Sequence, residues 1–252
     1  MAIDTSKNSY TIIFSIIMVF IVGGLLAGVS SSLSDKIKKN KELEKMQNIL
    51  FAMGVTDADD KNAFVSANQA ETMFKEFIGA EQYIITGATA VKTNEAFKIS
   101  NKKQADKVKA NASYQRQLEL YVGKKDGKTS YIVSMRGNGL WDAVWAYMAL
   151  DKDMVIQGAY FDHKGETPGL GANIKEAFFR DDFAGEHIFD KNGSYKGVTV
   201  KKGNADPKNE DKLDNEVDAM AGATITGDGI TAMVKKSLKM YIPYFKTLKK
   251  SN

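Results

Sequence analysis

The stretch Asp218-Ala-Met-Ala-Gly-Ala-Thr-Ile-Thr226 lies close to the C-terminus. Its small residues from Gly222 onward predict a tight turn, because glycine allows backbone conformations and close approaches that larger residues do not. A helical pattern of apolar residues follows over 229–240. The stretch therefore predicts a hydroxyl group, that of Thr226, close to the beginning of a helix.

Composition narrows the classes of function. A chain of 252 residues is long enough for one good-sized domain and an accessory segment, and 26% charged with 43% hydrophobic residues is typical of a folded protein. Cysteine is absent, which excludes disulfides, thiolate catalysis, iron–sulfur ligation and cysteine-based zinc sites. The two histidines, His163 and His187, are too few for a histidine-rich metal site, so no metal is expected. The net charge of +4 gives no argument for nucleic-acid binding. Electron chemistry in this chain would need an organic cofactor.

An apolar segment at residues 10–34 contains no Asp, Glu, Lys or Arg. As a helix with a rise of about 1.5 Å per residue it would extend roughly 37 Å, more than the ~30 Å hydrocarbon core of a bilayer. The alternative is a cleaved signal peptide, whose apolar region is usually about 7–15 residues long. The length of this segment favours a retained transmembrane helix.

Gly24 and Gly28 form a G-x-x-x-G pair inside this segment. Such small faces let two helices approach closely in lipid. Glycine is also common in membrane helices for other reasons, so chance occurrence remains an equal alternative.

The pattern of the remaining chain predicts an α+β fold with a mainly antiparallel sheet and flanking helices, preceded by the transmembrane helix. We divide the chain into a short tail at 1–9, the transmembrane helix at 10–34, a helical stalk at 35–54 and one domain at 55–252. Within the domain, helices are expected over 67–77, 174–183 and 229–240. Strand-like runs occur at 83–85, 115–122, 130–135, 154–161 and 196–200.

Taken together, Asp218 to Thr226 resembles the D-x-x-[S/T/A]-G-A-T-x-[S/T] acceptor motif of FMN-binding domains. The resemblance implies that FMN is attached to Thr226 through a phosphoester bond, which makes the chain a phosphoprotein and a flavoprotein. It also implies a flavin transferase that makes this bond from FAD and recognises Asp218. Such an acceptor is expected on an exposed turn, with the phosphate at a helix N-terminus.

Two further boxes extend the resemblance, Gly137-Asn-Gly-Leu-Trp141 and Glu166-Thr-Pro-Gly-Leu-Gly171. With the apolar segment and the acceptor motif, in this order, they make essentially the whole chain similar to the NqrC family of the Na+-translocating NADH:quinone oxidoreductase. That complex oxidises NADH, passes electrons through flavins and iron–sulfur centres to ubiquinone and pumps Na+. The resemblance implies a translocase component that receives electrons from an iron–sulfur centre in partner membrane subunits and passes them to the next flavin-bearing partner.

The cofactor-contacting residues that the resemblance suggests come from all three boxes. Glycines would let the backbone approach the flavin ring, Thr167 could bind its polar edge, and leucine and tryptophan side chains would offer an apolar surface. Glu166 could contact the cofactor or order its own loop, and Trp141 could instead pack in the core. The expected set is Leu140, Trp141, Glu166, Thr167, Gly169, Leu170, Gly171, Gly222, Ala223, Thr224 and the acceptor Thr226.

A second Gly-Ala-Thr occurs at Thr86-Gly-Ala-Thr89 and serves as an internal control. Aligned on the motif, its acceptor position falls on Val91, which has no hydroxyl. This copy therefore predicts only a connection between a strand and a turn. The true motif departs from the common pattern at Ala221, where serine or threonine is frequent in the family.

Membrane orientation is predicted differently by two arguments. The lysines that follow the apolar segment would keep the C-terminal part in the cytoplasm under the positive-inside rule, which counts best over short loops. The resemblance implies a single-pass protein of the bacterial inner membrane with its domain on the periplasmic side, and we follow it.

Two other functions are compatible with the same sequence features. The corresponding flavin-bearing component of an Rnf-type ferredoxin:NAD oxidoreductase shares the acceptor motif and the anchor. A non-redox extracytoplasmic binding or sensor module is an alternative of another class. NADH binding by this chain is not expected, because no G-x-G-x-x-G lies between a strand and a helix.

Overall fold

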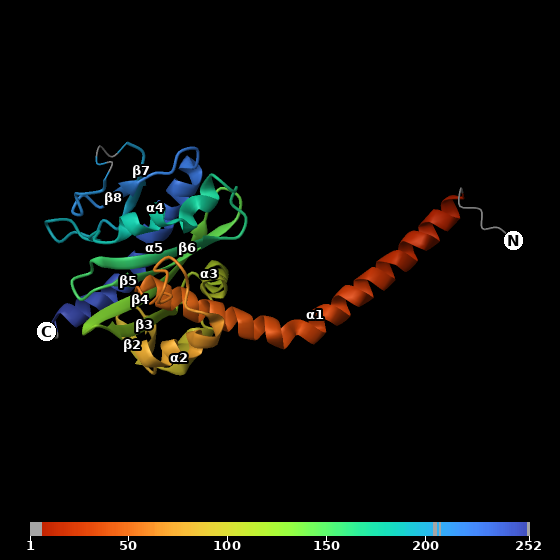
Figure 1. Ribbon diagram of the computed structural model, residues 1–252, viewed down its shortest axis with the longest axis horizontal. Helices are drawn as coiled ribbons and strands as arrows, with labels where there is room; N and C mark the ends of the chain where they lie inside the picture. The colour runs from red at the N-terminus through yellow and green to blue at the C-terminus, as the bar shows by residue number, and fades with distance from the viewer. Residues whose placement is uncertain (1–6, 204–205, 207, 251–252) are drawn as a thin grey trace. The chain divides into compact units, whose positions relative to one another are not determined.

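The computed structural model of the chain describes residues 7–203, 206 and 208–250 (Figure 1). These residues form two compact units, one up to Lys45 and one from Met46 onward, which are described separately. Of the expected tail at 1–9, residues 1–6 lie outside the described part of the chain.

Helix α1, Asn8–Ala52, makes up the described part of the first unit and continues into the second. The residues expected as span and stalk thus form one continuous helix. Its apolar side chains in the first unit are exposed, as at Phe20 and Leu26. A Cβ added at Gly24 or Gly28 would meet no atom within 4 Å. Among the described helices, α1 is the one long and apolar enough to cross a membrane.

The last turn of α1 belongs to the core of the second unit. Ile49, Leu50 and Ala52 are fully buried there. A Cβ at Gly158 would lie 2.7 Å from the carbonyl oxygen of Ala52, so the helix end rests directly on a strand of the sheet. Gly54, with a φ of +77°, follows the end of the helix, as a helix stop requires. The compact unit therefore begins within the residues expected as a stalk.

A six-stranded sheet forms the centre of the second unit, with the order β2-β1-β3-β4-β5-β6 and antiparallel pairing throughout. Its strands are β1 Gln82–Thr86, β2 Thr89–Lys92, β3 Leu118–Lys125, β4 Lys128–Asn138, β5 Ala143–Leu150 and β6 Ile156–His163. Two short strands, β7 Thr199–Lys201 and β8 Glu216–Asp218, pair in parallel. The prediction of an α+β fold with a mainly antiparallel sheet is confirmed.

The helices of the second unit, besides the end of α1, are α2 Ala67–Phe77, α3 Asn101–Ala110, α4 Ala177–Arg180 and α5 Thr224–Lys250. Short 3-10 helices span η1 Asn94–Lys98, η2 Gly171–Lys175 and η3 Asp181–Phe183. The helix expected over 67–77 has the bounds of α2. The single helix expected over 174–183 is wrong, because this segment is divided among η2, α4 and η3. The second Gly-Ala-Thr lies at the β1–β2 hairpin, as expected.

Helix α5 packs against β4 and covers one face of the sheet (Figure 1). Its apolar residues recur at helical spacing and join the alternate residues of β3, β4 and β5 in the main core. The core residues of α5 include Ile230, Val234, Leu238, Tyr241 and Phe245. The Tyr241 hydroxyl donates to the Glu119 carbonyl oxygen at 2.8 Å, which fixes the helix across β3.

Candidate functional site

Three segments far apart in the sequence meet at one end of the sheet. The turn 139–142 joins β4 to β5, and the loop 164–170 follows β6, whose end lies beside the start of β5 because Val144 pairs with His163. The start of α5 reaches the same place: a Cβ at Gly229 would lie 2.2 Å from the carbonyl oxygen of Asn138. Antiparallel neighbours thus bring the three boxes of the sequence together.

Thr226 lies in the first turn of α5, which the hydrogen bond from Gly227 N–H to Ala223 O closes at 2.9 Å. The side chain is only 2% exposed. The expectation of an acceptor on an exposed turn is therefore wrong in its exposure. The reason is the loop 164–170 (the Glu166 loop), which covers the turn. The Thr226 hydroxyl donates to Glu166 Oε2 at 2.5 Å.

Glu166 is buried, with 4% of its surface exposed, and its carboxylate is held on both sides. Oε2 accepts from the Thr226 hydroxyl, and Oε1 accepts from the Trp141 backbone N–H at 2.9 Å. Burial alone would raise the pKa of Glu166, but these donors, together with the backbone N–H groups of Leu140 and Asp142, hold the pKa below its ordinary value. At neutral pH the group is a buried carboxylate whose charge is stabilised by hydrogen bonds.

Glycines make room for this contact. A Cβ at Gly171 would lie 2.4 Å from Thr226 Oγ1 and 2.6 Å from Glu166 Oε2. A Cβ at Gly139 would lie 2.6 Å from Glu166 Oε1. Gly222 adopts a φ of +73°, and its Cβ would meet Leu170 Cδ2 at 2.8 Å. These three glycines allow the segments to approach closely around one carboxylate and one hydroxyl.

A cavity of about 240 Å³ lies where the segments meet. Exposed residues of the Glu166 loop and of the acceptor motif form its rim, and Glu166 and Thr226 form its buried wall. The residues that line it are Leu140, Glu166, Thr167, Leu170, Gly171, Gly222, Ala223, Thr224, Ile225 and Thr226. Of the expected contact residues that the structure describes, Trp141 and Gly169 lie outside this lining.

Apolar side chains are exposed around the cavity, which is unusual for residues of their size. Leu140, Leu170 and Ile225 are 46%, 41% and 57% exposed, and Trp141 is 69% exposed. The Trp141 indole N–H donates to Thr167 Oγ1 at 3.2 Å, so the ring is fixed although it is in solvent. Trp141 does not pack in the core, which was the alternative to cofactor contact.

Three residues of the site were not predicted from the sequence. Ile225 lies inside the motif, and its place next to the acceptor in the first helical turn could have marked it. Gly139 lies inside the Gly-Leu-Trp box, where only the contact with Glu166 reveals its role. His163 ends β6, and its Nδ1 accepts from the Glu166 backbone N–H at 3.1 Å, so it orders the loop that follows.

Asp218, expected as the residue that the flavin transferase recognises, ends strand β8. Asp218 is not among the described residues that line the cavity. The turn of the acceptor motif follows directly after its strand. Lys201, across from Asp218 in the β7–β8 pair, forms an ion pair with Glu216 at 2.8 Å.

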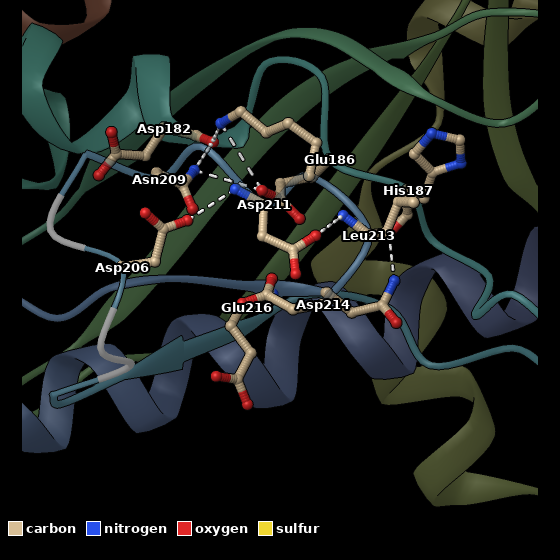
Figure 2. A network of polar contacts seen from close by, with 11 residues as sticks. Asp182, Glu186, His187, Asp206, Asn209, Asp211, Leu213, Asp214 and Glu216 are labelled. Carbon is tan, nitrogen blue, oxygen red and sulfur yellow. Dashed lines mark hydrogen bonds and ion pairs between the residues drawn. The ribbon is translucent and has the colours of Figure 1, made fainter.

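A buried polar network fixes the segment that leads into β8 (Figure 2). Glu186 is fully buried, and its Oε1 lies 3.2 Å from Asn209 Nδ2 and 3.6 Å from Lys212 Nζ. Both nitrogens also donate to the Asp182 carbonyl oxygen, at 2.6 and 2.9 Å. Within the described residues, Glu186 Oε2 and Asn209 Oδ1 have no partner.

The pH dependence of stability is expected to change when Glu186 is replaced by glutamine. Burial raises the pKa of Glu186 to about 7, with Asp214 adding to the shift and Lys212 and Asn209 opposing it. The folded protein thus binds this proton more tightly than the unfolded chain, so stability from this group is complete below pH 4.5 and is lost as the pH rises through about 7. The loss is at most about 3 kcal/mol.

Urea unfolding of the wild type and the Glu186→Gln variant from about pH 5 to about pH 8 measures this effect. We expect the wild type to lose stability relative to the variant over that range. Parallel profiles would show that Glu186 does not titrate there.

Known proteins share both the sequence pattern and the fold of this chain. Residues 139–239 match the FMN-binding domain family. Curated relatives include the NqrC protein of the Na(+)-translocating NADH-quinone reductase from Yersinia pestis, 26% identical over 91% of this chain and 90% of the relative. The same protein from Neisseria meningitidis serogroup B is 28% identical over 98% of this chain and 96% of the relative.

Solved structures agree with these relatives. The crystal structure of NqrC of the Na(+)-translocating NADH-quinone reductase from Parabacteroides distasonis is 32% identical, with a TM-score of 0.70 over 84% of this chain and 96% of that chain. The Shewanella oneidensis NqrC structure, 20% identical with a TM-score of 0.66, shows the same fold. The chain belongs to the NqrC family of Na(+)-translocating NADH-quinone reductase subunits.

Proposed function

We propose that this electron-carrying subunit holds one FMN joined to Thr226 by a phosphoester bond, and that it relays electrons from an anchored position in the membrane. The observation that carries the proposal is the place of the Thr226 hydroxyl. It lies in the first turn of α5, on the wall of a cavity whose rim combines glycines with exposed apolar side chains.

The residues present fit a flavin mononucleotide. The N-terminal turn of α5 offers backbone N–H groups and the positive end of the helix dipole, which suit a phosphate on Thr226. Leu140, Leu170 and Ile225 offer apolar surface next to the acceptor, which suits a flavin ring. Attachment through the phosphate would leave the ring free to accept and donate electrons. Thr167 and the loop glycines would contact its polar parts and admit its approach.

The partners follow from the family. The relatives are named for a reductase that uses NADH, reduces a quinone and translocates Na+. We expect this chain to receive electrons from an iron–sulfur centre of partner membrane subunits and to pass them to another flavin-bearing partner. The FMN would be attached by a flavin transferase that recognises Asp218. Membership of the NqrC family favours this function over that of an Rnf-type component or a non-redox sensor module.

Membrane anchoring would use the apolar part of α1. Its exposed apolar side chains and its hydropathy suit a bilayer, and residues 10–34, at 1.5 Å per residue, extend about 37 Å, more than the ~30 Å hydrocarbon core. We place the second unit on the periplasmic side of the bacterial inner membrane. Asn192→Cys, at an exposed position of a chain without cysteine, tests this. A membrane-impermeant thiol reagent should label intact cells; labelling only after the inner membrane is broken would reverse the orientation.

Flavin fluorescence of the denatured chain tests the attachment. The protein is produced with its flavin transferase, unfolded in detergent and separated on a denaturing gel. We expect yellow fluorescence to migrate with the chain, because a phosphoester bond survives unfolding and a non-covalent flavin does not. A dark band from a preparation that contained the transferase and FAD would contradict covalent attachment and favour a non-redox module.

A further inference from the structure

We propose that Glu166 is the group that takes the proton from the Thr226 hydroxyl when the flavin phosphoester forms. The proposal rests on the proposed attachment of FMN to Thr226 and adds a chemical role within this chain. It differs from a contact with the finished cofactor or an ordering of the loop, because it assigns the carboxylate to the attachment step itself.

The hydrogen bond between the two side chains carries the argument. Thr226 Oγ1 donates its proton to Glu166 Oε2 at 2.5 Å, a short charge-assisted contact between two groups that are 2% and 4% exposed. A threonine hydroxyl is a weak nucleophile, and an adjacent base is the usual means of activating one. The distance is within the reach that proton transfer to a base requires.

The rest of the pocket holds the carboxylate in this role. The Trp141 backbone N–H binds Oε1 at 2.9 Å, so Oε2 is left for the hydroxyl. The Glu166 backbone N–H is bound by His163 at 3.1 Å, which fixes the position of the residue along its loop. The Asp142 carboxylate, in the turn between β4 and β5, forms an ion pair with Lys164 at 2.7 Å. Gly171 keeps the space between the two side chains open.

The attachment step balances with a flavin dinucleotide as donor. The Thr226 Oγ1–H bond breaks and its proton passes to Glu166 Oε2. Thr226 Oγ1 forms a bond to the phosphorus next to the flavin, and the bond from that phosphorus to the bridging oxygen breaks. The nucleoside monophosphate leaves with that oxygen and its electron pair. Nothing is oxidised or reduced.

The proton that Glu166 takes up also stabilises the site after the phosphoester has formed. The phosphodiester on Thr226 would carry a negative charge beside Glu166, and two like charges in contact are unfavourable in a buried site. A Glu166 that keeps the proton is neutral and can donate to the new ester. The same residue then accepts from the hydroxyl before attachment and donates after it.

Rates of attachment to the Glu166→Gln variant test the proposal. Purified transferase and FAD are added to the unmodified chain, and covalent fluorescence is followed with time. Glutamine has nearly the shape of glutamate but cannot take a proton, so we expect attachment to slow by about 100-fold or more. Raising the pH from about 6 to about 9 should restore part of the rate in the variant, since hydroxide in solution can replace the base. Glu166→Asp should retain an intermediate rate.

Two controls separate the outcomes. His163→Gln removes the imidazole that accepts from the Glu166 backbone N–H. Its rate should fall where the loop loses this contact, but its pH dependence should remain that of the wild type because the carboxylate is retained. Circular dichroism and thermal melting confirm that each variant is folded. Attachment to Thr226 in Glu166→Gln at the wild-type rate would overturn the role of Glu166 and leave the proposed function intact. A wild-type chain that takes no flavin on Thr226 would instead overturn the proposed function.

Discussion

Replacement of Thr226 by valine is expected to abolish covalent flavin. Valine has the shape of threonine without the hydroxyl, so no phosphoester can form at this position. No covalent flavin should remain on this variant. Its fluorescence on a denaturing gel should equal that of a chain never exposed to FAD. Because the hydroxyl also donates to the buried Glu166, we further expect a destabilisation of about 1–3 kcal/mol.

Two variants control this result. Thr226→Ser keeps a hydroxyl on the same turn and should still be modified. Thr89→Val changes the second Gly-Ala-Thr, which lies at the β1–β2 hairpin, and should keep full fluorescence. Covalent fluorescence that persists in Thr226→Val, with the chain folded, would place the attachment on another residue.

Replacement of Gly171 by alanine is expected to reduce attachment at least tenfold. The added Cβ would lie 2.4 Å from Thr226 Oγ1 and 2.6 Å from Glu166 Oε2, so the two side chains must separate or the loop must move. Overpacking of a filled site costs on the order of 1–3 kcal/mol, and a displaced acceptor reacts more slowly. Covalent flavin per chain and the thermal midpoint measure the two effects.

Gly165→Ala is the matched control for this variant. Gly165 lies in the loop 164–170, which ends directly before Gly171, and a Cβ there would meet only Asp142 Cβ, at 3.9 Å, which is ordinary contact. We expect wild-type attachment and nearly wild-type stability. If Gly171→Ala is modified as fast as Gly165→Ala, the close contact of Thr226 with Glu166 does not matter for attachment.

Segments with a clear apolar periodicity could be predicted from the sequence. Segments that are buried on both faces could not. The 67–77 helix was predicted because its apolar residues follow one helical face, with Ala70 and Phe74 buried. Strand β5 was missed as a run, since seven of its eight residues are buried and no alternation remains to mark it. The apolar residues of 174–183 suggested one helix, although the structure buries them from three short elements.

The residue types of the site were predictable, and its burial was not. A motif specifies that Thr226 follows a small-residue turn, but the Glu166 loop that covers it comes from 60 positions away along the chain. The roles of Gly139 and His163 could not be predicted for the same reason. Each acts through a contact with Glu166 that depends on the pairing of β4, β5 and β6, which no local pattern encodes.

Mass mapping of one tryptic peptide tests the central claim most directly. Cleavage after Lys212 and Lys235 releases Leu213–Lys235, in which the hydroxyl side chains are Thr224, Thr226 and Thr231. We expect this peptide to gain the mass of FMN less one water, with the gain confined to fragments that contain Thr226. The same gain on Thr224 or Thr231, or an unmodified peptide from a chain that fluoresces after denaturation, would contradict the assignment of Thr226 as the flavin acceptor.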